Sequence, residues 1–426
     1  MESRNAIEGG ARMHYGWIIA GVTFLVLLVG GGLRGSSGIL VVPLQNDFQW
    51  SVATISCALA VNITMYGLVG PFAGAMMERG LRRCITTALL AVIAALVLTF
   101  RMSQAWQLVV LWGVVGAGCG VLANVLAATV ATRWFEAKRG LVVGILTSAS
   151  SAGQLIFLPL LTGIAVSLGW RWMVLAAAAV TAGLVPIVLL LMRGRPEELG
   201  LRPYGQEGTV EDEAKPATAH ESAFPVLLGA IRRADFWLIA GSLFICGAST
   251  NGLVGTHLIA VCVDRGLGQM QGANLLATMA VFNFVGATAS GWLTDRIDSR
   301  YLLGTYYALR ALSLLYLPFA FDSFYGLSIV SVFYGLDWTA TIPPTIRITA
   351  DRFGTAQAGI MIGWLMAVHQ LGGAAAALGA GILRFDLGSY VQTFLMSGAL
   401  CLGATGMVLL ISTPGAGHTG KILKPA

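Results

Sequence analysis

Twelve long stretches of predominantly apolar residues follow one another along this 426-residue chain. An α-helix needs about 20 such residues to cross the hydrocarbon core of a bilayer, whereas a membrane β-strand needs only about ten residues of alternating polarity. Charged residues make up 11% of the chain, against roughly 25% in an ordinary soluble domain. Disorder is excluded because hydrophobic residues make up 56%. We therefore expect an all-α polytopic membrane protein.

The apolar stretches fall into two sets of six. We place the spans at approximately 15–44, 52–76, 84–101, 104–131, 139–167, 171–192, 235–263, 272–293, 301–320, 324–346, 357–383 and 390–412. Residues 193–234 form the long polar segment between the sets. We expect a cytoplasmic linker there, joining an N-terminal six-helix bundle (1–192) to a C-terminal one (235–426), and its polar, acidic stretch Gln206–Glu221 is predicted to be flexible.

The positive charges predict the orientation. If both termini lie in the cytoplasm, 20 of the 26 Lys and Arg residues fall in inner segments and four in outer turns. This bias agrees with the positive-inside rule. The net charge of +6 therefore reflects membrane topology and does not indicate nucleic-acid binding. Residues 1–13 are polar and show no signal-peptide pattern, so we expect a multi-pass protein of the plasma (cytoplasmic) membrane that is inserted by its first span.

The two sets of spans repeat each other. Nine residues of the first set, Gly74, Glu78, Arg79, Arg83, Arg133, Gly140, Gly144, Gly153 and Gly169, recur in order as Gly291, Asp295, Arg296, Arg300, Arg352, Gly359, Gly363, Gly372 and Gly388. The offset between partners changes by only two residues over the series. Two related halves packed around a site near the bilayer midplane are a transporter architecture.

The loops after the second and eighth spans carry a known pattern. Each begins with a glycine, continues with an acid–arginine pair and ends with basic residues, from Gly74 to Arg83 and from Gly291 to Arg300. This pattern resembles the signature of the major facilitator superfamily, although Glu78 stands where aspartate is usual. The resemblance implies the major facilitator fold, with twelve transmembrane helices in two pseudo-symmetric six-helix bundles. It also implies that these basic motifs form a cytoplasmic gate.

The gate residues are expected to bridge helix ends when the protein opens outward. They are Glu78, Arg79, Arg83, Arg133, Asp295, Arg296 and Arg300. Positive-inside topology alone would also place basic residues there.

Further motifs point to one group within this superfamily. They are Tyr15-Gly16-Trp17, Pro43-Leu44, Trp50-Ser51, Trp134-Phe135, Lys138-Arg139-Gly140 and Pro196-Glu197-Glu198. They are similar to monocarboxylate transporters and their bacterial oxalate:formate antiporter relatives, which move small organic anions, often with protons. One feature departs from that group, because Asn283 and Ala287 stand where its eighth span carries an Asp–Arg pair. The proton-coupled drug exporters fit less well, since Gln154 follows Gly153 where they have a Gly-Pro pair.

Three charged residues fall deep in apolar spans: Arg34, Arg310 and Asp337. Such residues are costly in a membrane and are functional candidates by default. The resemblance places a cationic residue close to Arg34, and a guanidinium suits a carboxylate because it can bind bidentately. The alternative is that Arg34 snorkels or pairs structurally. Arg310 and Asp337 lie on an antiparallel hairpin and are expected to form a buried pair, with Asp337 also a candidate proton carrier.

Polar residues elsewhere in the spans complete the candidate site. His257 and His369 are candidate proton-coupling groups, although packing is the commoner role of a membrane histidine. The predicted substrate-binding set is Arg34, Asn124, Gln154, Asn251, His369 and Gln370. Tyr66, Phe282, Tyr334 and Trp364 are aromatic candidates for the wall of the site, although most membrane aromatics merely pack.

We find no metal-ligand spacing, nucleophile–base set or ATP-binding motif, so we expect no metal, no cofactor and no enzymatic activity. The predicted function is secondary active transport of a small, monocarboxylate-like anion with a proton, by alternating access, in a monomer. The alternatives are anion exchange of the oxalate:formate type, uptake or efflux of another small solute, and a transport-inactive membrane sensor. The short polar linker argues against the sensor, because it is too small to be a signalling domain.

Overall fold

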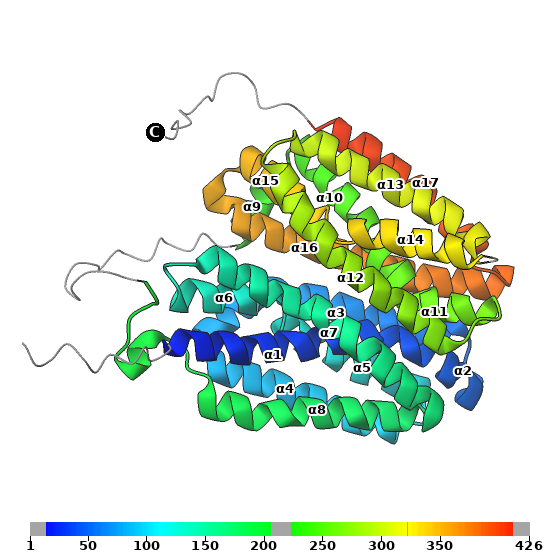
Figure 1. The fold of residues 1–426 in the computed structure, drawn as a ribbon, viewed down its shortest axis with the longest axis horizontal. Helices are drawn as coiled ribbons and strands as arrows, with labels where there is room; N and C mark the ends of the chain where they lie inside the picture. Colours follow the sequence, from blue (N-terminus) through cyan, green and yellow to red (C-terminus); the bar gives the residue numbers. More distant parts are fainter. Residues whose placement is uncertain (1–13, 206–222, 322, 412–426) are drawn as a thin grey trace, which may run out of the picture.

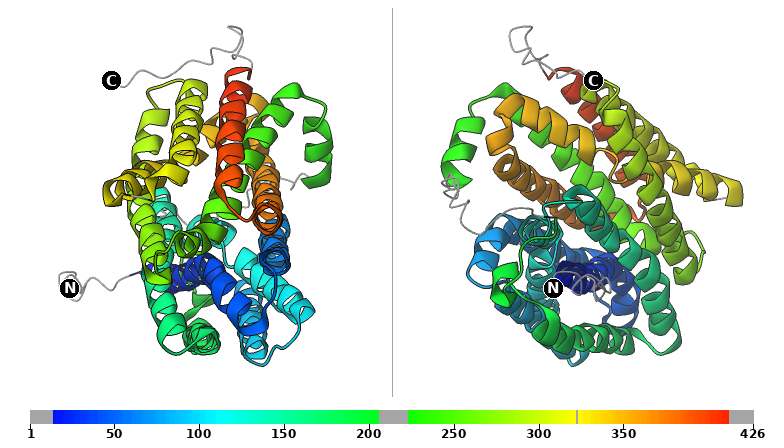
Figure 2. Two further views of the ribbon diagram at one scale, coloured as in Figure 1. Left: turned by 90° about the vertical axis from the view of Figure 1, so that its right-hand side faces the viewer. Right: turned by 60° about the vertical axis from the view of Figure 1, so that its left-hand side comes forward.

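The computed structural model describes residues 14–205, 223–321 and 323–411, and this part of the chain is almost entirely helical. Its N-terminal half contains α1 (Tyr15–Gly35), the 3₁₀ segment η1 (Ser36–Leu40), α2 (Val41–Phe48), α3 (Val52–Glu78), α4 (Leu81–Phe100), α5 (Ala105–Val121), α6 (Asn124–Trp134), α7 (Arg139–Ser167) and α8 (Trp170–Leu191). Its C-terminal half contains α10 (Ala234–Gly247), the π-helical segment η3 (Ala248–Val254), α11 (Gly255–Asp264), α12 (Gln269–Thr294), α13 (Ser299–Ala320), α14 (Phe324–Asp337), α15 (Ile342–Phe353), α16 (Thr355–Leu387) and α17 (Val391–Leu409). Figures 1 and 2 show the two halves side by side.

Helices occupy all twelve predicted spans. Ten stretches within the described ranges are long and apolar enough to cross a membrane. The ninth span, α13, is more polar because it contains four tyrosines and two arginines. The tenth span is divided into α14 and α15, which have 14 and 12 residues and are too short to cross singly.

Every third span is interrupted: the first at η1, the fourth between α5 and α6, the seventh at η3 and the tenth between α14 and α15. Local sequence explains two of these breaks. At η1 the hydroxyls of Ser36 and Ser37 donate to the carbonyls of Leu33 and Arg34 and compete with the α-helical pattern. In the tenth span α15 restarts with prolines in its first turn, where a missing N–H costs nothing. Interrupted helices at membrane depth are typical of transporter binding sites.

The repeated glycines mark equivalent helix crossings in the two halves. Gly153 of α7 lies against the backbone of Leu28 in α1, and Gly372 of α16 lies in the same way against Phe244 in α10. A side chain at either glycine would collide with a carbonyl oxygen. Close packing of the first span with the fifth, and of the seventh with the eleventh, is therefore the physical reason for this repeat.

Gly153→Val should lower the melting temperature and the yield of monodisperse protein in detergent. The added methyl groups would force α7 away from α1, and overpacking of this kind costs about 1–3 kcal/mol or more. Gly144→Val on the same helix is the matched control, because nothing lies within 4 Å of a β carbon there. Equal thermal stability of the two variants would contradict the assigned crossing.

The halves meet at one end and separate at the other. We call the end with the loops after α3 and α12 the inner end, and the opposite end the outer end (left and right in Figure 1). At the outer end Gly38 lies against the backbone of Gly255 and Thr256, and Gly381 lies against Ser56. The inner segments α6 and α15 instead find their main packing partners within their own halves. The protein is thus closed at its outer end and open at its inner end.

Two parts of the segment between the halves lie within the described residues and form short helices. The first contains the 3₁₀ helix η2 (Pro196–Leu199) and the second contains the helix α9 (Ala223–Ala230). Tyr204 exchanges backbone hydrogen bonds with Trp134, Glu136 and Ala137, which ties the first part to the inner end of the N-terminal half. The stretch predicted to be flexible, Gln206–Glu221, lies outside the described residues.

Candidate functional site

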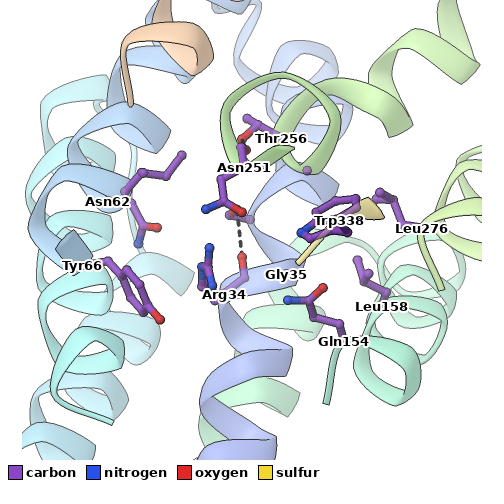
Figure 3. A pocket seen from close by; sticks show the side chains of 13 residues that line it. Arg34, Gly35, Asn62, Tyr66, Gln154, Leu158, Asn251, Thr256, Leu276 and Trp338 are labelled. Carbon is purple, nitrogen blue, oxygen red and sulfur yellow. Dashed lines mark hydrogen bonds between the residues drawn. The ribbon is translucent and has the colours of Figure 1, made fainter. Parts of the chain in front are cut away.

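A polar cavity of about 40 Å³ lies between the two halves near the middle of the bundle (Figure 3). Its wall comes from α1, η1, α3 and α7 of one half and from η3, α11, α12 and the residue after α14 of the other. A water molecule needs roughly 10–15 Å³ of such volume, so the cavity holds about three waters or a ligand of comparable size. Its polar lining residues are Arg34, Ser37, Asn62, Tyr66, Gln154, Asn251 and Thr256.

Arg34 is the one charged side chain among the residues that line this cavity. It lies in the last turn of α1, is half-buried, and its guanidinium carbon sits 4.6 Å from the centre of the Tyr66 ring. None of the described acidic side chains forms an ion pair with it. An unpaired guanidinium at membrane depth, stacked on an aromatic face, is a ready partner for an anion.

Carboxamide groups surround Arg34 on several sides. Gln154 and Asn251, both in the predicted substrate-binding set, line the cavity from opposite halves. Gln370 lies behind this wall, where its side-chain oxygen accepts a hydrogen bond from Asn251 Nδ2 at 3.1 Å. Asn62 also borders the cavity and donates to the carbonyl of Trp112 at 2.7 Å. The side chain of Asn124 lies outside the described part of the structure.

The cavity wall also contains Trp338, which the sequence analysis missed. A sequence signal for Trp338 does exist: it directly follows the charged Asp337, and the prolines that begin α15 come soon after it. Of the aromatic candidates, Tyr66 lines the cavity, whereas Tyr334 is buried and donates from its hydroxyl to the carbonyl of Ser249 at 2.9 Å.

Arg310 and Asp337 form a fully buried ion pair within the C-terminal half. Arg310 Nε lies 2.5 Å from Asp337 Oδ2, and the side chains are 0% and 3% exposed. The guanidinium also donates to the backbone carbonyls of Asp337 at 2.8 Å and Trp338 at 3.4 Å. Arg310 therefore caps the C-terminal end of α14, where carbonyl groups lack helical partners and the helix dipole attracts a cation.

The two histidines lie in different surroundings. His257 is fully buried, and its Nε2 and Nδ1 atoms lie 2.8 Å from the Ala377 carbonyl and 3.1 Å from the Tyr390 hydroxyl. These contacts between α11, α16 and the turn after it fit a packing role. His369 is next to Cys246, and its buried Nδ1 has no hydrogen-bond partner among the described residues. Neither histidine is among the cavity-lining residues.

The predicted gate residues lie at the inner end. Asp295 accepts from Arg347 Nη1 at 3.4 Å, and Arg133 Nη1 donates to the Met77 carbonyl at 3.5 Å. Arg300 lies 2.9 Å from Asp298, and its hydrogen bonds lower the pKa of that carboxyl below its ordinary value. Each of these contacts stays within one half, as expected where the inner ends of the halves are apart.

The remaining gate residues are also at this end. Glu78 and Arg79 close α3, Arg83 lies at the start of α4, and Arg296 stacks on Trp292 with 3.9 Å between the guanidinium carbon and the ring centre.

Sequence comparison matches the chain to a family model described as Major Facilitator Superfamily, over residues 22–377 and 264–425. The chain is 23% identical over 406 residues to the uncharacterized MFS-type transporter YcxA of Bacillus subtilis, with 93% of this chain and 94% of the relative covered. It is 25% identical to monocarboxylate transporter 13 of Rattus norvegicus, covering 93% and 89% of the two chains. It is 27% identical to monocarboxylate transporter 11 of Homo sapiens, covering 94% and 83%.

Structure comparison gives the same fold. The chain is similar to a bacterial homologue of the human lysosomal transporter Spinster in its inward-facing, occupied conformation, with a TM-score of 0.71 at 14% identity over 93% of this chain and 97% of that one. The inward-facing, unoccupied conformation of that protein gives a TM-score of 0.69 at 16% identity, covering 95% and 100%.

Proposed function

The chain belongs to the major facilitator superfamily, and from this premise we propose that it carries a small organic anion of the monocarboxylate type together with a proton. Arg34 would bind the carboxylate, and Gln154 and Asn251 would hydrogen-bond the rest of the anion. Membership of this superfamily supports a multi-pass membrane transporter. The substrate, the proton and the residue roles are our proposals. We further propose that the protein is a monomer of the plasma membrane with both termini cytoplasmic, and that it is not an enzyme.

One observation carries the choice of an anion: the cavity between the halves has a single charged lining residue, Arg34, and this cation forms no ion pair with the acidic side chains that the structure describes. A carboxylate there would gain charge-assisted hydrogen bonds, whereas a cationic ligand would meet repulsion. One arginine suits one carboxylate, and the volume of about 40 Å³ suits a small acid. The relatives named monocarboxylate transporters support the same substrate class.

The mechanism that we propose is alternating access. The site lies between two halves that are in contact at the outer end and apart at the inner end, so rocking of one half against the other would expose it to the other side. Inner closure would bring the basic motifs after α3 and α12 together with neighbouring helix ends.

Uptake by the purified protein in proteoliposomes tests this function. With the inside more alkaline, labelled small acids such as formate, acetate, lactate, pyruvate and oxalate should be screened, and we expect saturable uptake of a monocarboxylate. A gradient of about one pH unit should drive about tenfold accumulation if one proton moves with each monoanion. Uptake that ignores the gradient but requires anion inside would favour exchange. Transport of none of the acids would overturn the proposal.

A further inference from the structure

The break between α14 and α15 connects a buried ion pair, the cavity wall and the contact between the halves. We propose that Asp337 is the residue at which the proton couples to transport, and that it acts through this break without touching the anion. This inference rests on the proposed function and assigns to one residue the proton that the function requires. Asp337 is thus a positioning residue for the cavity, distinct from Arg34, which would bind the anion.

Asp337 has one oxygen available for a proton. Its Oδ2 accepts from Arg310 Nε, while Oδ1 is buried and has no hydrogen-bond partner among the described residues. A buried oxygen without a donor is costly for a charged carboxylate, and a proton bound there would remove the charge. The step is simple proton binding: a proton from water bonds to Oδ1 in one state and returns to water on the other side.

Arg310 can tolerate a neutral Asp337. Besides the carboxylate, its guanidinium donates to Cys246 Sγ at 2.8 Å, to Ser249 Oγ at 3.5 Å and to the two carbonyls at the end of α14. These partners would keep the arginine bound while its attraction to the carboxylate weakens. A neutral Asp337 would leave the Arg310 guanidinium without its counter-ion, but these hydrogen bonds would still satisfy its N–H groups.

The residues between α14 and α15 connect the Arg310–Asp337 pair to the cavity and to the N-terminal half. Arg310 holds the carbonyl of Trp338, whose side chain lines the cavity. The next residue, Thr339, donates from its N–H at 3.0 Å and from its hydroxyl at 2.5 Å to Asn283 Oδ1 in α12. Asn283 Nδ2 in turn donates to Ser151 Oγ in α7 of the N-terminal half at 3.3 Å.

Hydrogen bonds, together with the peptide bond between Trp338 and Thr339, thus connect the buried ion pair to the contact between Asn283 and Ser151 of the two halves. Protonation of Asp337 would loosen the hold of Arg310 on the break, and so alter both the Trp338 wall and the Asn283–Ser151 contact. Anion binding and proton binding would then bias the same element, which is what coupling between two ligands requires.

Few other groups near the Arg310–Asp337 pair could bind the coupled proton. The other titratable groups that face it are Cys246 on α10, Tyr306 and Tyr307 on α13, Tyr334 on α14, His369 on α16 and Cys401 on α17. The described side chains of α12 next to the break, Asn283 and Ser290, are uncharged. Asp337 is the one carboxyl group among these described residues around Arg310.

Two transport assays on the same proteoliposomes separate coupling from binding. Counterflow exchanges labelled for unlabelled anion and needs no net proton movement, whereas accumulation above the external concentration needs the pH gradient. The probe is the carboxylate that the wild type transports best in the screen above. Asp337→Asn keeps the side-chain shape but removes the proton site. We expect it to retain counterflow and to lose accumulation altogether, with exchange that no longer varies with pH.

Asp264→Asn is the matched control, because Asp264 forms another ion pair of the C-terminal half, with Arg384 at 2.6 Å, and is 35% exposed. It should retain both activities. Wild-type accumulation in Asp337→Asn, or its loss in His369→Gln but not in Asp337→Asn, would overturn the inference. Wild-type protein that gives no counterflow with any carboxylate would instead overturn the proposed function.

A second variant tests the route if Asp337→Asn does not fold. Thr339→Val leaves the ion pair intact and removes the hydroxyl bond from the break to Asn283. We expect a lower accumulation ratio at the same pH gradient with counterflow retained, since the break would transmit less of the change. An accumulation ratio equal to that of the wild type would overturn the route through the break.

Discussion

Replacing Arg34 by glutamine should lower the uptake of the preferred carboxylate by roughly 100-fold, through weaker binding of the anion. Two charge-assisted hydrogen bonds from one guanidinium are worth about 3 kcal/mol in total after solvation, and each 1.4 kcal/mol is a factor of ten. Arg34→Lys should fall between the variant and the wild type, because an ammonium keeps the charge but loses the planar fork. Uptake kinetics in proteoliposomes measure both effects.

Arg101→Gln is the matched control for this prediction. Arg101 is an exposed arginine at the outer end of α4, away from the cavity, so its loss should leave uptake unchanged. Size-exclusion chromatography should show that Arg34→Gln is folded, since the guanidinium forms no ion pair with the described acidic residues. A folded Arg34→Gln protein with wild-type uptake would mean that Arg34 only lies along the cavity wall and does not bind the anion.

Arg310→Met should destabilise the protein strongly and lower the amount that survives extraction in detergent. The substitution leaves Asp337 charged and buried without its partner, and breaking a buried pair in this way costs about 3–5 kcal/mol. It also leaves the carbonyls at the end of α14 without their cap. Thermal melting of the purified variant measures the loss.

The double variant Arg310→Met with Asp337→Asn should recover much of that stability, because no unpaired charge remains buried. Arg384→Met is the control for removing an arginine from a salt bridge. Its pair with Asp264 is partly exposed, and such pairs are worth only about 0–1 kcal/mol. A double variant as unstable as Arg310→Met alone would show that the cap on α14, and not the charge of Asp337, carries the stability.

The sequence identifies several residues of the cavity but does not show that they lie together. Arg34, Gln154 and Asn251 were selected separately, as polar groups that need a reason to lie in a membrane span. Only packing of α1, α7 and η3 brings them to one cavity, because these elements are far apart in the chain. Gln370 shows the limit of this reasoning: it was selected by the same argument, yet it supports Asn251 from behind.

The sequence does not predict the breaks in the helices. Hydropathy averages over the few residues at which a helix is interrupted, so each span is predicted to be one continuous helix. Trp338 was missed for this reason, and so was the hydrogen-bonded connection from Thr339 through Asn283 to Ser151. Such bonds join three elements that hydropathy treats as independent.

By itself, the sequence determined that the chain crosses a membrane as twelve helices in two related halves, because transfer of apolar side chains out of water is a local property that adds up along each span. It also indicated that Arg310 and Asp337 are near each other, since a hairpin sets their depths. The tertiary structure alone decided that Arg34 lines the cavity without an ion-pair partner among the described acidic residues, and that the Arg310–Asp337 pair caps the end of α14. These features depend on which helices cross and at what register, and close packing at residues such as Gly153 and Gly372 sets that geometry.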